Sequence, residues 1–291
     1  MNTQPSITTA IVPAAGLGSR MRPLSDAVPK ELLPLGRRTA LQHLVSELTA
    51  AGINRIVFVT SPAKESLLRG AFGDRDSETR AAFAYALQHS MRGLGDAIGQ
   101  ARSLVEEDAP VLVALGDAVI RETVIGGLTA RLIASCASDP RTVGLAVQRV
   151  PPEKISRYGI VDPVSPEGRR DGDFFAIRGV VEKPKPEHAP SDFAAAARYV
   201  LPFATFATLL ATPPDAKGEV QLTDALRALL AAGHPGVAVP LRPDEARHDI
   251  GGFDSYFRAF AQFALADSEF GPGFRCELSA ILNSNKEPDV E

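Results

Sequence analysis

A glycine-rich segment at residues 16–23 (GLGSRMRP) constrains the fold of this chain more than any other feature. It directly follows Thr9–Ala15, an apolar stretch typical of a buried strand. A glycine-rich turn after a strand lets backbone N–H groups approach a polyphosphate, because no Cβ atom stands in the way. The segment lacks the spacing G-x-x-x-x-G-K-[ST], so it is not a P-loop.

Prolines and cations distinguish this turn from a dinucleotide-binding one. Pro23 and Pro29 stop a helix from running on after the second glycine, so a Rossmann dinucleotide turn is not expected. No suitable acidic residue follows the second predicted strand, which also argues against a dinucleotide-dependent oxidoreductase. Arg20, Arg22 and Lys30 are cations suited to a triphosphate. The segment therefore predicts nucleotide phosphate chemistry.

Along the chain, apolar runs of strand length alternate with helical segments, which indicates an α/β fold with a parallel sheet. The predicted strands are Ala10–Ala14, Arg55–Thr60, Ala82–Leu87, Pro110–Leu115, Val143–Arg149, Arg178–Glu182, Ala196–Leu201 and Gly236–Pro240. The predicted helices are a first one between a Thr39 cap and Gly52, then Gly95–Glu106, Thr223–Ala232 and Phe253–Leu265. Residues 1–240 are expected to form one domain. Residues 241–291 are expected to be a helical segment that completes the metal site and packs on the core or on a partner subunit.

Composition excludes several classes of protein. The 291 residues are 45% hydrophobic and carry a formal net charge of -4, which argues against a nucleic-acid binder. Cys136 and Cys276 lie far apart and offer neither a disulfide framework nor metal-ligand spacing. Residues 1–5 lack the basic and apolar regions of a secretory leader, and no apolar run is long enough to span a bilayer. We expect a cytoplasmic protein that contacts neither membrane nor nucleic acid.

Two aspartates are candidate metal ligands. Asp117 ends an apolar strand, and ligands of open α/β sheets bind at the carboxyl ends of strands. Asp249 also follows a strand-like segment and precedes a helix. Carboxylates so placed suit Mg²⁺, which prefers oxygen donors, although each could equally be a helix cap or a turn residue.

Other polar residues end strands as well. Gln88 has a side-chain amide that can pair with the edge of a base, and Gly93 lets a base or ribose lie against the backbone. Glu182 and Lys183 leave a strand just before a proline. Adjacent opposite charges at a strand end are commonly only solvated, so this pair alone predicts no site.

Taken together, these segments resemble the bacterial UTP–glucose-1-phosphate uridylyltransferases, a family of sugar-phosphate nucleotidyltransferases. The resemblance covers nearly the whole chain, and its segments stand in the family's order. They are Gly16–Arg20, Pro29–Pro34, Gly93–Gly95, Leu115–Asp117, Arg157–Val161, Val181–Pro184, Ala197–Leu201 and Gly218–Ala225. Any one of them is weak, but the ordered set is specific.

The resemblance implies a Rossmann-like nucleotidyltransferase fold, with a mixed, mostly parallel sheet flanked by helices. It implies that UTP and glucose 1-phosphate give UDP-glucose and pyrophosphate with Mg²⁺, by in-line attack on the α-phosphorus. Such catalysis is mostly positioning and charge neutralisation, so no covalent nucleophile is required. Together with the aromatic stripe on Phe253–Leu265, it also implies a homo-oligomer, either a dimer or a tetramer.

The resemblance also implies roles for individual residues. Arg20, Lys30 and Lys183 would be catalytic, the first two on the triphosphate and Lys183 on the sugar phosphate. Asp117 and Asp249 would hold the Mg²⁺ ion. The implied nucleotide-binding residues are Ala14, Ala15, Gly16, Gly18, Gln88 and Gly93. The implied sugar-phosphate-binding residues are Gly159, Glu182, Lys183 and Arg198, with Ala197 beside it.

Several positions depart from the family pattern. Asp96 stands where a histidine is usual, and Gly116 replaces the common proline before the metal aspartate. Leu35–Ala40 lacks the usual Asp-Lys-Pro, and Gly70–Thr79 is shorter than usual. These departures leave three hypotheses open: the uridylyltransferase, a nucleotidyltransferase for another base or sugar such as dTTP or galactose 1-phosphate, and a non-catalytic nucleotide-sugar-binding relative.

Overall fold

The computed structural model describes residues 7–165 and 174–284. The expectation that the chain has no secretory leader rests on residues 1–5, which lie outside the described residues. Within the described ranges, no helix combines the length and the apolar character that crossing a membrane requires.

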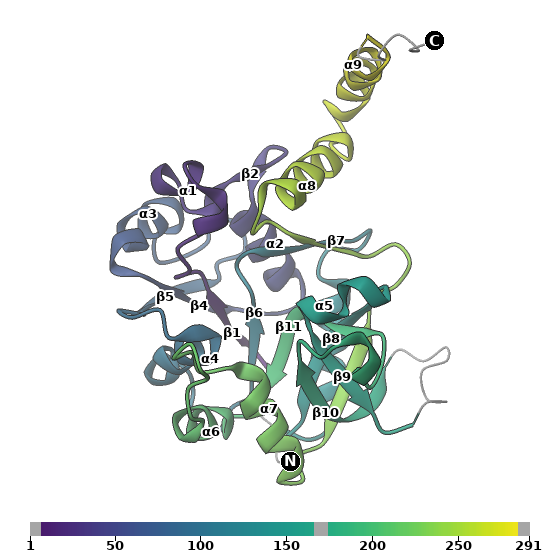
Figure 1. Cartoon of the computed structure of the whole chain (residues 1–291). Coiled ribbons are helices and arrows are strands. Elements are labelled where there is room, and N and C mark those ends of the chain that lie inside the picture. The colour runs from purple at the N-terminus through teal and green to yellow at the C-terminus, as the bar shows by residue number, and fades with distance from the viewer. Residues whose placement is uncertain (1–6, 166–173, 285–291) are drawn as a thin grey trace.

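A nine-stranded mixed sheet forms the centre of the molecule (Figure 1). In spatial order its strands are β5 (Ala82–Leu87), β4 (Arg55–Thr60), β1 (Thr9–Pro13), β6 (Val111–Ala114), β11 (Phe193–Leu201), β8 (Val143–Arg149), β12 (Gly236–Pro240), β10 (Phe175–Glu182) and β9 (Gly159–Pro163). Strands β10 and β11 run opposite to the other seven. The prediction of a mixed, mostly parallel sheet is thereby confirmed.

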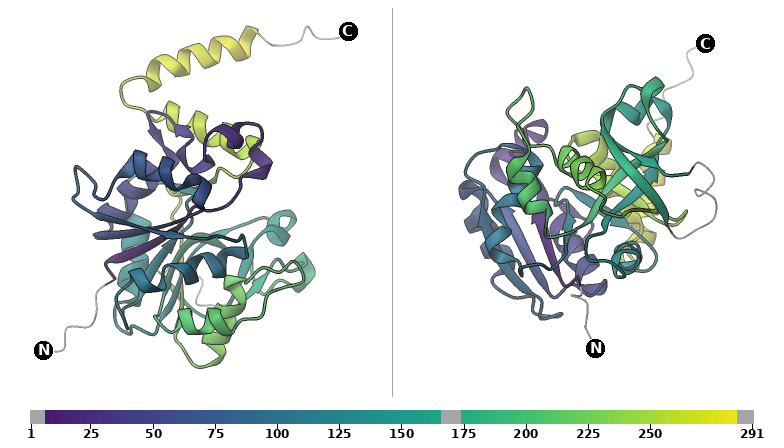
Figure 2. Two further views of the ribbon diagram at one scale, coloured as in Figure 1. Left: turned by 90° about the vertical axis from the view of Figure 1, so that its left-hand side faces the viewer. Right: turned by 90° about the horizontal axis from the view of Figure 1, so that it is seen from below.

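Helices cover both faces of the sheet, as two views at right angles show (Figure 2). Packed on one face are α2 (Ala40–Ala50), α3 (Pro62–Phe72) and α5 (Gly127–Cys136). Packed on the other face are α4 (Gly93–Gln100), α6 (Thr205–Ala211) and α7 (Leu222–Ala231). Strand β1 alternates between the two layers, since Ile11 packs with the second set of helices whereas Ala10 and Val12 pack with the first. The alternation follows from the two-residue period of a strand.

Helix α2 begins and ends as its sequence predicts. The Thr39 hydroxyl accepts a hydrogen bond from the Gln42 backbone N–H, and the Gln42 side chain accepts one from the Thr39 N–H. This reciprocal capping box satisfies two donors that the first turn would otherwise leave unpaired. After the helix, Gly52 adopts φ +97°, a conformation that favours glycine.

A second, smaller layer was not predicted. Strand β7 (Ala118–Arg121) pairs antiparallel with β13 (Ala246–Asp249), and the short strands β2 (Pro34–Leu35) and β3 (Arg38–Thr39) form a hairpin. Helix α8 (Phe253–Leu265) packs on this layer through Tyr256, whose hydroxyl donates to the Pro34 carbonyl at 3.1 Å. Helix α9 (Gly271–Ser284) projects away from the body (Figure 1).

Some predicted boundaries were wrong. The helix expected over Gly95–Glu106 is α4, which ends at Gln100 and is followed by a 3₁₀ turn, Arg102–Leu104. Gly99 and Ser103 are weak helix formers, which explains the early end. Strand β11 starts at Phe193 rather than Ala196, because its buried alanines gain stability from neighbouring strands and not from intrinsic strand propensity. The sequence analysis did not predict helices α1 (Leu24–Ala27), α3, α5, α6 and α9, or strand β9 of the central sheet.

Candidate functional site

Four parallel strands bring the predicted nucleotide residues to one edge of the sheet. Strand β1 pairs in parallel with β4 and β6, and β4 pairs in parallel with β5, so their carboxyl ends share an edge. The glycine-rich loop follows β1, and helix α3 follows β4. Gln88 follows β5, and Asp117 follows β6 after two residues. This is the edge at which open α/β sheets bind ligands.

The glycine-rich loop turns through Gly18, which has φ +65°. The Ser25 hydroxyl donates to the Gly18 carbonyl at 2.9 Å and ties the loop to the short helix α1 (Leu24–Ala27). Between them lies only a 3₁₀ turn, Ser19–Met21, before Pro23. The predicted interruption of the helix is thus confirmed, and Arg20 is left exposed to solvent.

Lys64, on helix α3, binds the backbone of this loop. The sequence analysis did not identify it. Its ammonium donates to the Ala14 carbonyl at 3.1 Å and to the Gly16 carbonyl at 2.5 Å. It also pairs with the buried Glu31 carboxylate at 3.1 Å. Burial raises the pKa of Glu31, and the nearby lysines oppose that shift. The only available sequence clue was a lysine in the first turn after a strand, and α3 itself had not been predicted.

Lys30 and Asp117 meet although 87 residues separate them. The buried Lys30 ammonium donates to Asp117 Oδ2. Burial alone would lower the lysine pKa, but the charges of Asp117, Glu31 and Asp249 outweigh it and raise that pKa. Burial would conversely raise the pKa of Asp117, yet Lys30 holds it below the usual value. The site thus keeps both groups charged.

Gly116 explains how Asp117 is held without the usual proline. Its N–H donates to the Pro13 carbonyl at 3.1 Å, a bond that proline could not make. A Cβ atom on Gly116 would lie 2.9 Å from that same carbonyl oxygen, so only glycine fits without movement. This departure from the family pattern therefore ties Asp117 directly to the end of β1.

The pairing of strands β7 and β13 brings Asp249 beside Asp117. Asp249 pairs with Ala118 across the two strands, and the Ile250 N–H donates to the Asp117 carbonyl at 3.0 Å. The largely buried Arg247, which was not predicted, lies 3.2 Å from the Asp249 carboxylate. A Cβ atom on Gly251 would come within 2.7 Å of the Arg20 guanidinium, which places Arg20 at the same corner.

The two aspartates fit a divalent cation. Both carboxylates are partly exposed, and the charge of each raises the pKa of Lys30. Carboxylate oxygens are the ligands that Mg²⁺ prefers. In the described part of the chain no group of three or more His, Cys, Asp or Glu could hold a metal. Mg²⁺ usually binds one or two carboxylates together with substrate phosphates, so a pair of aspartates matches that habit.

The predicted base-binding residues lie against helix α4. The Gln88 side-chain nitrogen donates to the Gly93 carbonyl at 3.2 Å and to Asp96 Oδ2 at 2.8 Å. Gly93 has φ +93°, and a Cβ atom there would lie 2.9 Å from the Val220 carbonyl oxygen. The segment around Val220 therefore packs tightly against the Gly93–Gly95 turn.

Across the site lie the residues predicted for the sugar phosphate. Lys183 has φ +44°, its N–H donates to the Tyr158 carbonyl at 3.0 Å, and its ammonium pairs with Glu182 at 2.7 Å. A Cβ atom on Gly159 would lie 3.4 Å from Glu182 and close to Thr223. The pair is therefore positioned by a strained backbone at the end of β10.

The prediction for Arg198 was wrong. Its guanidinium is fully buried and makes two 2.7 Å bonds to the Glu47 carboxylate on α2. It also donates to the carbonyls of Ala197 and Ala118, each at 3.0 Å. A group so enclosed cannot reach a sugar phosphate. Ala197 is buried as well.

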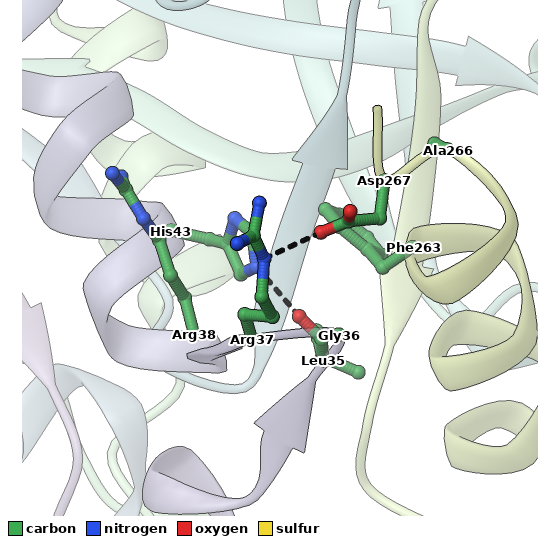
Figure 3. Close-up of a pocket in the computed structure, with 8 residues that line it drawn as sticks. All are labelled: Leu35, Gly36, Arg37, Arg38, His43, Phe263, Ala266 and Asp267. Atoms are coloured by element: carbon green, nitrogen blue, oxygen red, sulfur yellow. Dashed lines mark hydrogen bonds and ion pairs between the residues drawn. The ribbon is translucent and has the colours of Figure 1, made fainter. Parts of the chain in front are cut away.

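A cavity of about 490 Å³ lies between the β2–β3 hairpin and helix α8, and its lining includes none of the predicted site residues. Arg37 reaches across it to Asp267 at 2.7 Å, and the His43 ring packs at a tilt against Phe263 with ring centroids 4.6 Å apart (Figure 3). The segment Leu35–Ala40, which lacks the Asp-Lys-Pro usual in the family, lines one side of this cavity and leads into α2.

Comparison with known proteins gives consistent results. The nucleotidyl transferase family matches residues 9–265. A Pseudomonas aeruginosa protein named UTP–glucose-1-phosphate uridylyltransferase is 33% identical over 272 residues, which cover 87% of this chain and 94% of that protein. The solved structure of a UTP-bound UGPase from Acinetobacter baumannii matches with a TM-score of 0.83 and 27% identity, covering 98% of this chain and all of the other. A UDP-glucose pyrophosphorylase complexed with UDP-glucose matches with a TM-score of 0.78 and 28% identity, over 88% of this chain and 98% of that one.

Proposed function

The chain belongs to the nucleotidyl transferase family, and on that premise we propose that it transfers a uridylyl group from UTP to glucose 1-phosphate. The products are UDP-glucose and pyrophosphate. Relatives named for this reaction, and structural neighbours described with UTP and with UDP-glucose, support the choice of substrates. The observation that supports the chemistry is the contact between Lys30 and Asp117 at the mouth of the glycine-rich loop.

The proposed mechanism is an in-line displacement. A phosphate oxygen of glucose 1-phosphate attacks the α-phosphorus of UTP, and the bond to pyrophosphate breaks. Arg20 and Lys30 neutralise the triphosphate, while Gly16 and Gly18 keep its approach to the backbone open. Lys183 holds the phosphate of the incoming sugar. Charge neutralisation of this kind stabilises the transition state by several kcal/mol, on the order of 3 for one group.

The residues on the two sides have separate tasks. Gln88, Gly93 and the backbone of Ala14 and Ala15 receive the base. The Glu182 carboxylate accepts hydrogen bonds from the sugar hydroxyls, and Gly159, which has no side chain, leaves room beside it. The two sets would hold both substrates around one phosphorus atom, which is the positioning contribution that such reactions need.

The family generally uses a divalent metal, and we assign Asp117 and Asp249 as its protein ligands, with Mg²⁺ as the ion. When bound, Mg²⁺ would supply positive charge to the phosphate oxygens. Lys30 shares Asp117 with it and keeps that carboxylate ionised. Chelation should abolish turnover, and added Mg²⁺ should restore it.

The decisive experiment is pyrophosphate release measured over a matrix of substrates. UTP, dTTP, ATP, CTP and GTP are each paired with the 1-phosphates of glucose, galactose and N-acetylglucosamine. We expect the maximum at UTP with glucose 1-phosphate. A maximum elsewhere would keep the mechanism and replace the substrate. Silence over the whole matrix, with UDP-glucose still bound, would indicate a non-catalytic relative.

We further propose that the enzyme works in the cytoplasm, where its nucleotide substrate is available, and that it is a homo-oligomer, a dimer or a tetramer. Free Cys136 and Cys276 are compatible with a reducing compartment. Residues 241–291 would serve both roles predicted for them: Asp249 completes the metal site, and helices α8 and α9 offer the subunit contact. The apolar side chains exposed on those helices support the second role.

A further inference from the structure

Asp96 occupies an unusual place for a carboxylate near a triphosphate. It lies in the first turn of α4 and is largely buried. Its two oxygens have different partners: Oδ2 accepts from the Gln88 amide at 2.8 Å, and Oδ1 accepts from the Arg92 guanidinium at 2.8 Å. Arg92 is the cation that compensates its charge, and it is itself mostly exposed. Arg92 thus occupies Oδ1 and leaves Oδ2 for the hydrogen bond with Gln88.

The contacts of Gln88 define which way its amide points. Both groups in front of its side-chain nitrogen, the Asp96 carboxylate and the Gly93 carbonyl, can only accept hydrogen bonds. The nitrogen has two protons, and these two acceptors use both. Turning the amide over would set its oxygen against two acceptors. In the described part of the chain, no donor is paired with the Gln88 amide oxygen, so that oxygen remains available.

Neither acceptor can easily turn away. Gly93 is wedged against Val220, whose N–H bonds to the Arg92 carbonyl at 2.7 Å. Asp96 is fixed on the helix by Arg92 and, more weakly, by Gln100. The Gln88 backbone N–H continues the sheet by donating to the Thr60 carbonyl at 2.8 Å. The orientation of the amide is therefore set before any nucleotide arrives.

We propose that Asp96 is a positioning residue that selects the base by holding the Gln88 amide with its oxygen toward the nucleotide. This inference rests on the proposed function, in which Gln88 contacts the base. Uracil and thymine have an N3–H donor, which a fixed acceptor matches. Cytosine has an unprotonated N3 acceptor at the same place, and the same oxygen repels it. Asp96 thereby favours UTP over CTP and does not separate UTP from dTTP.

The test compares Asp96→Asn with the wild type and with Arg92→Gln. Asparagine has nearly the same shape but can turn its own NH₂ toward Gln88, which removes one of the two acceptors that oppose the reversed amide. Arg92→Gln removes the other partner of Asp96 and keeps the bond to Gln88. Calorimetry gives the dissociation constants of UTP, dTTP and CTP for each protein. Thermal unfolding verifies folding, and kinetics give the KM of glucose 1-phosphate.

We expect Asp96→Asn to reduce the preference for UTP over CTP by at least about fivefold, the size of exchanging a charge-assisted for a neutral hydrogen bond. The UTP-to-dTTP ratio and the KM of glucose 1-phosphate should stay within twofold. Arg92→Gln loosens Asp96 but keeps its carboxylate in front of Gln88, so it should reduce the preference for UTP over CTP by clearly less than Asp96→Asn does. An equal weakening of all three nucleotides, or the same loss of preference in Arg92→Gln, would overturn the proposal. Because binding is measured apart from turnover, a wild type that binds UTP but releases no pyrophosphate refutes the proposed function alone. Failure to bind any nucleotide refutes both.

Discussion

At the scale of single residues, three buried cations in or beside the site each pair with a carboxylate. Lys30 meets Asp117, Lys64 meets Glu31, and Arg198 meets Glu47, each across a long stretch of chain. A buried pair adds little net stability because removing two charges from water is costly, but removing one partner leaves an uncompensated charge. These pairs therefore define where backbone segments lie more than they strengthen the fold.

Substitution of Asp117 by Asn should separate chemistry from folding. The amide keeps the shape of the side chain but loses the charge that pairs with Lys30 and that we propose as a metal ligand. We expect turnover to fall by at least about 100-fold, as for other losses of transition-state charge stabilisation. Steady-state pyrophosphate release measures it. Asp139→Asn, at a distant surface turn, is the matched control, and near-normal activity of Asp117→Asn would sink the metal assignment.

Glu47→Gln should destabilise the protein strongly. It would leave the fully buried Arg198 without its counter-charge and weaken the 2.6 Å bond from the Thr129 hydroxyl. We expect a loss of about 3 kcal/mol in the free energy of unfolding, measured by urea denaturation. The control is Glu65→Gln, which removes an exposed helical pair with Arg69 and should cost no more than about 0.5 kcal/mol. Equal costs would contradict the structural role given to Arg198.

At the scale of elements, the β7–β13 strand pair carries a partly buried histidine whose protonation makes stability depend on pH. His248 lies on β13 next to Asp249, and its ring packs edge-on against Phe263. Burial, with help from the charges of Arg121 and Arg247, lowers the pKa of His248 to about 4. The unfolded chain therefore takes up this proton at a higher pH than the folded one.

The sign of the pH effect follows from that shift. Stability from a neutral His248 is complete above the unfolded pKa of 6.5 and is lost as pH falls toward 4. We expect His248→Phe to reduce the loss of unfolding free energy between pH 7 and pH 4 by about 1–2 kcal/mol, after discounting for partial exposure. Denaturant melts at the two pH values measure it. The exposed His89→Gln should leave the loss unchanged, and an unchanged loss in His248→Phe would exclude this histidine as the cause.

At the scale of the whole molecule, helices α8 and α9 form a C-terminal arm, in which α8 packs on the small strand layer and α9 projects from the body (Figures 1 and 2). On α9, Ile281 and Leu282 are 52% and 63% exposed. The aromatic residues predicted to form a stripe on α8 do not all face the same way. Tyr256 is buried against the protein, whereas Phe257 is exposed to solvent. Exposed apolar side chains on one arm are typical of an interaction surface.

Light scattering should therefore give a mass of two or four chains at working concentration. The double substitution Ile281→Glu and Leu282→Glu should lower that mass, because it places charges in the proposed contact. Leu210→Glu is the control, since Leu210 is 90% exposed on α6, away from the arm. A monomeric wild type, or equal dissociation by both variants, would rule out this arm as the subunit contact.

Much of the local structure was predictable from sequence because it depends on short-range physics. Apolar runs of strand length predicted every strand of the central sheet except β9, the Thr39 cap predicted the start of α2, and the prolines predicted the interrupted turn after β1. The placement of Asp117 at a strand end followed from the same pattern. Whether these residues carry the roles assigned to them stays a prediction.

Tertiary structure decided which distant residues meet. Asp249 reaches Asp117 only because β13 pairs with β7, and both strands are too short for a periodic pattern. Lys64 supports the loop from a helix that the sequence pattern did not predict, and Arg198 is buried by Glu47 from 151 residues away. The contact between Asp96 and Gln88 likewise depends on how helix α4 packs against the end of β5. Local conformational preferences are properties of a few adjacent residues, whereas the pairing of charges depends on where the whole chain places them.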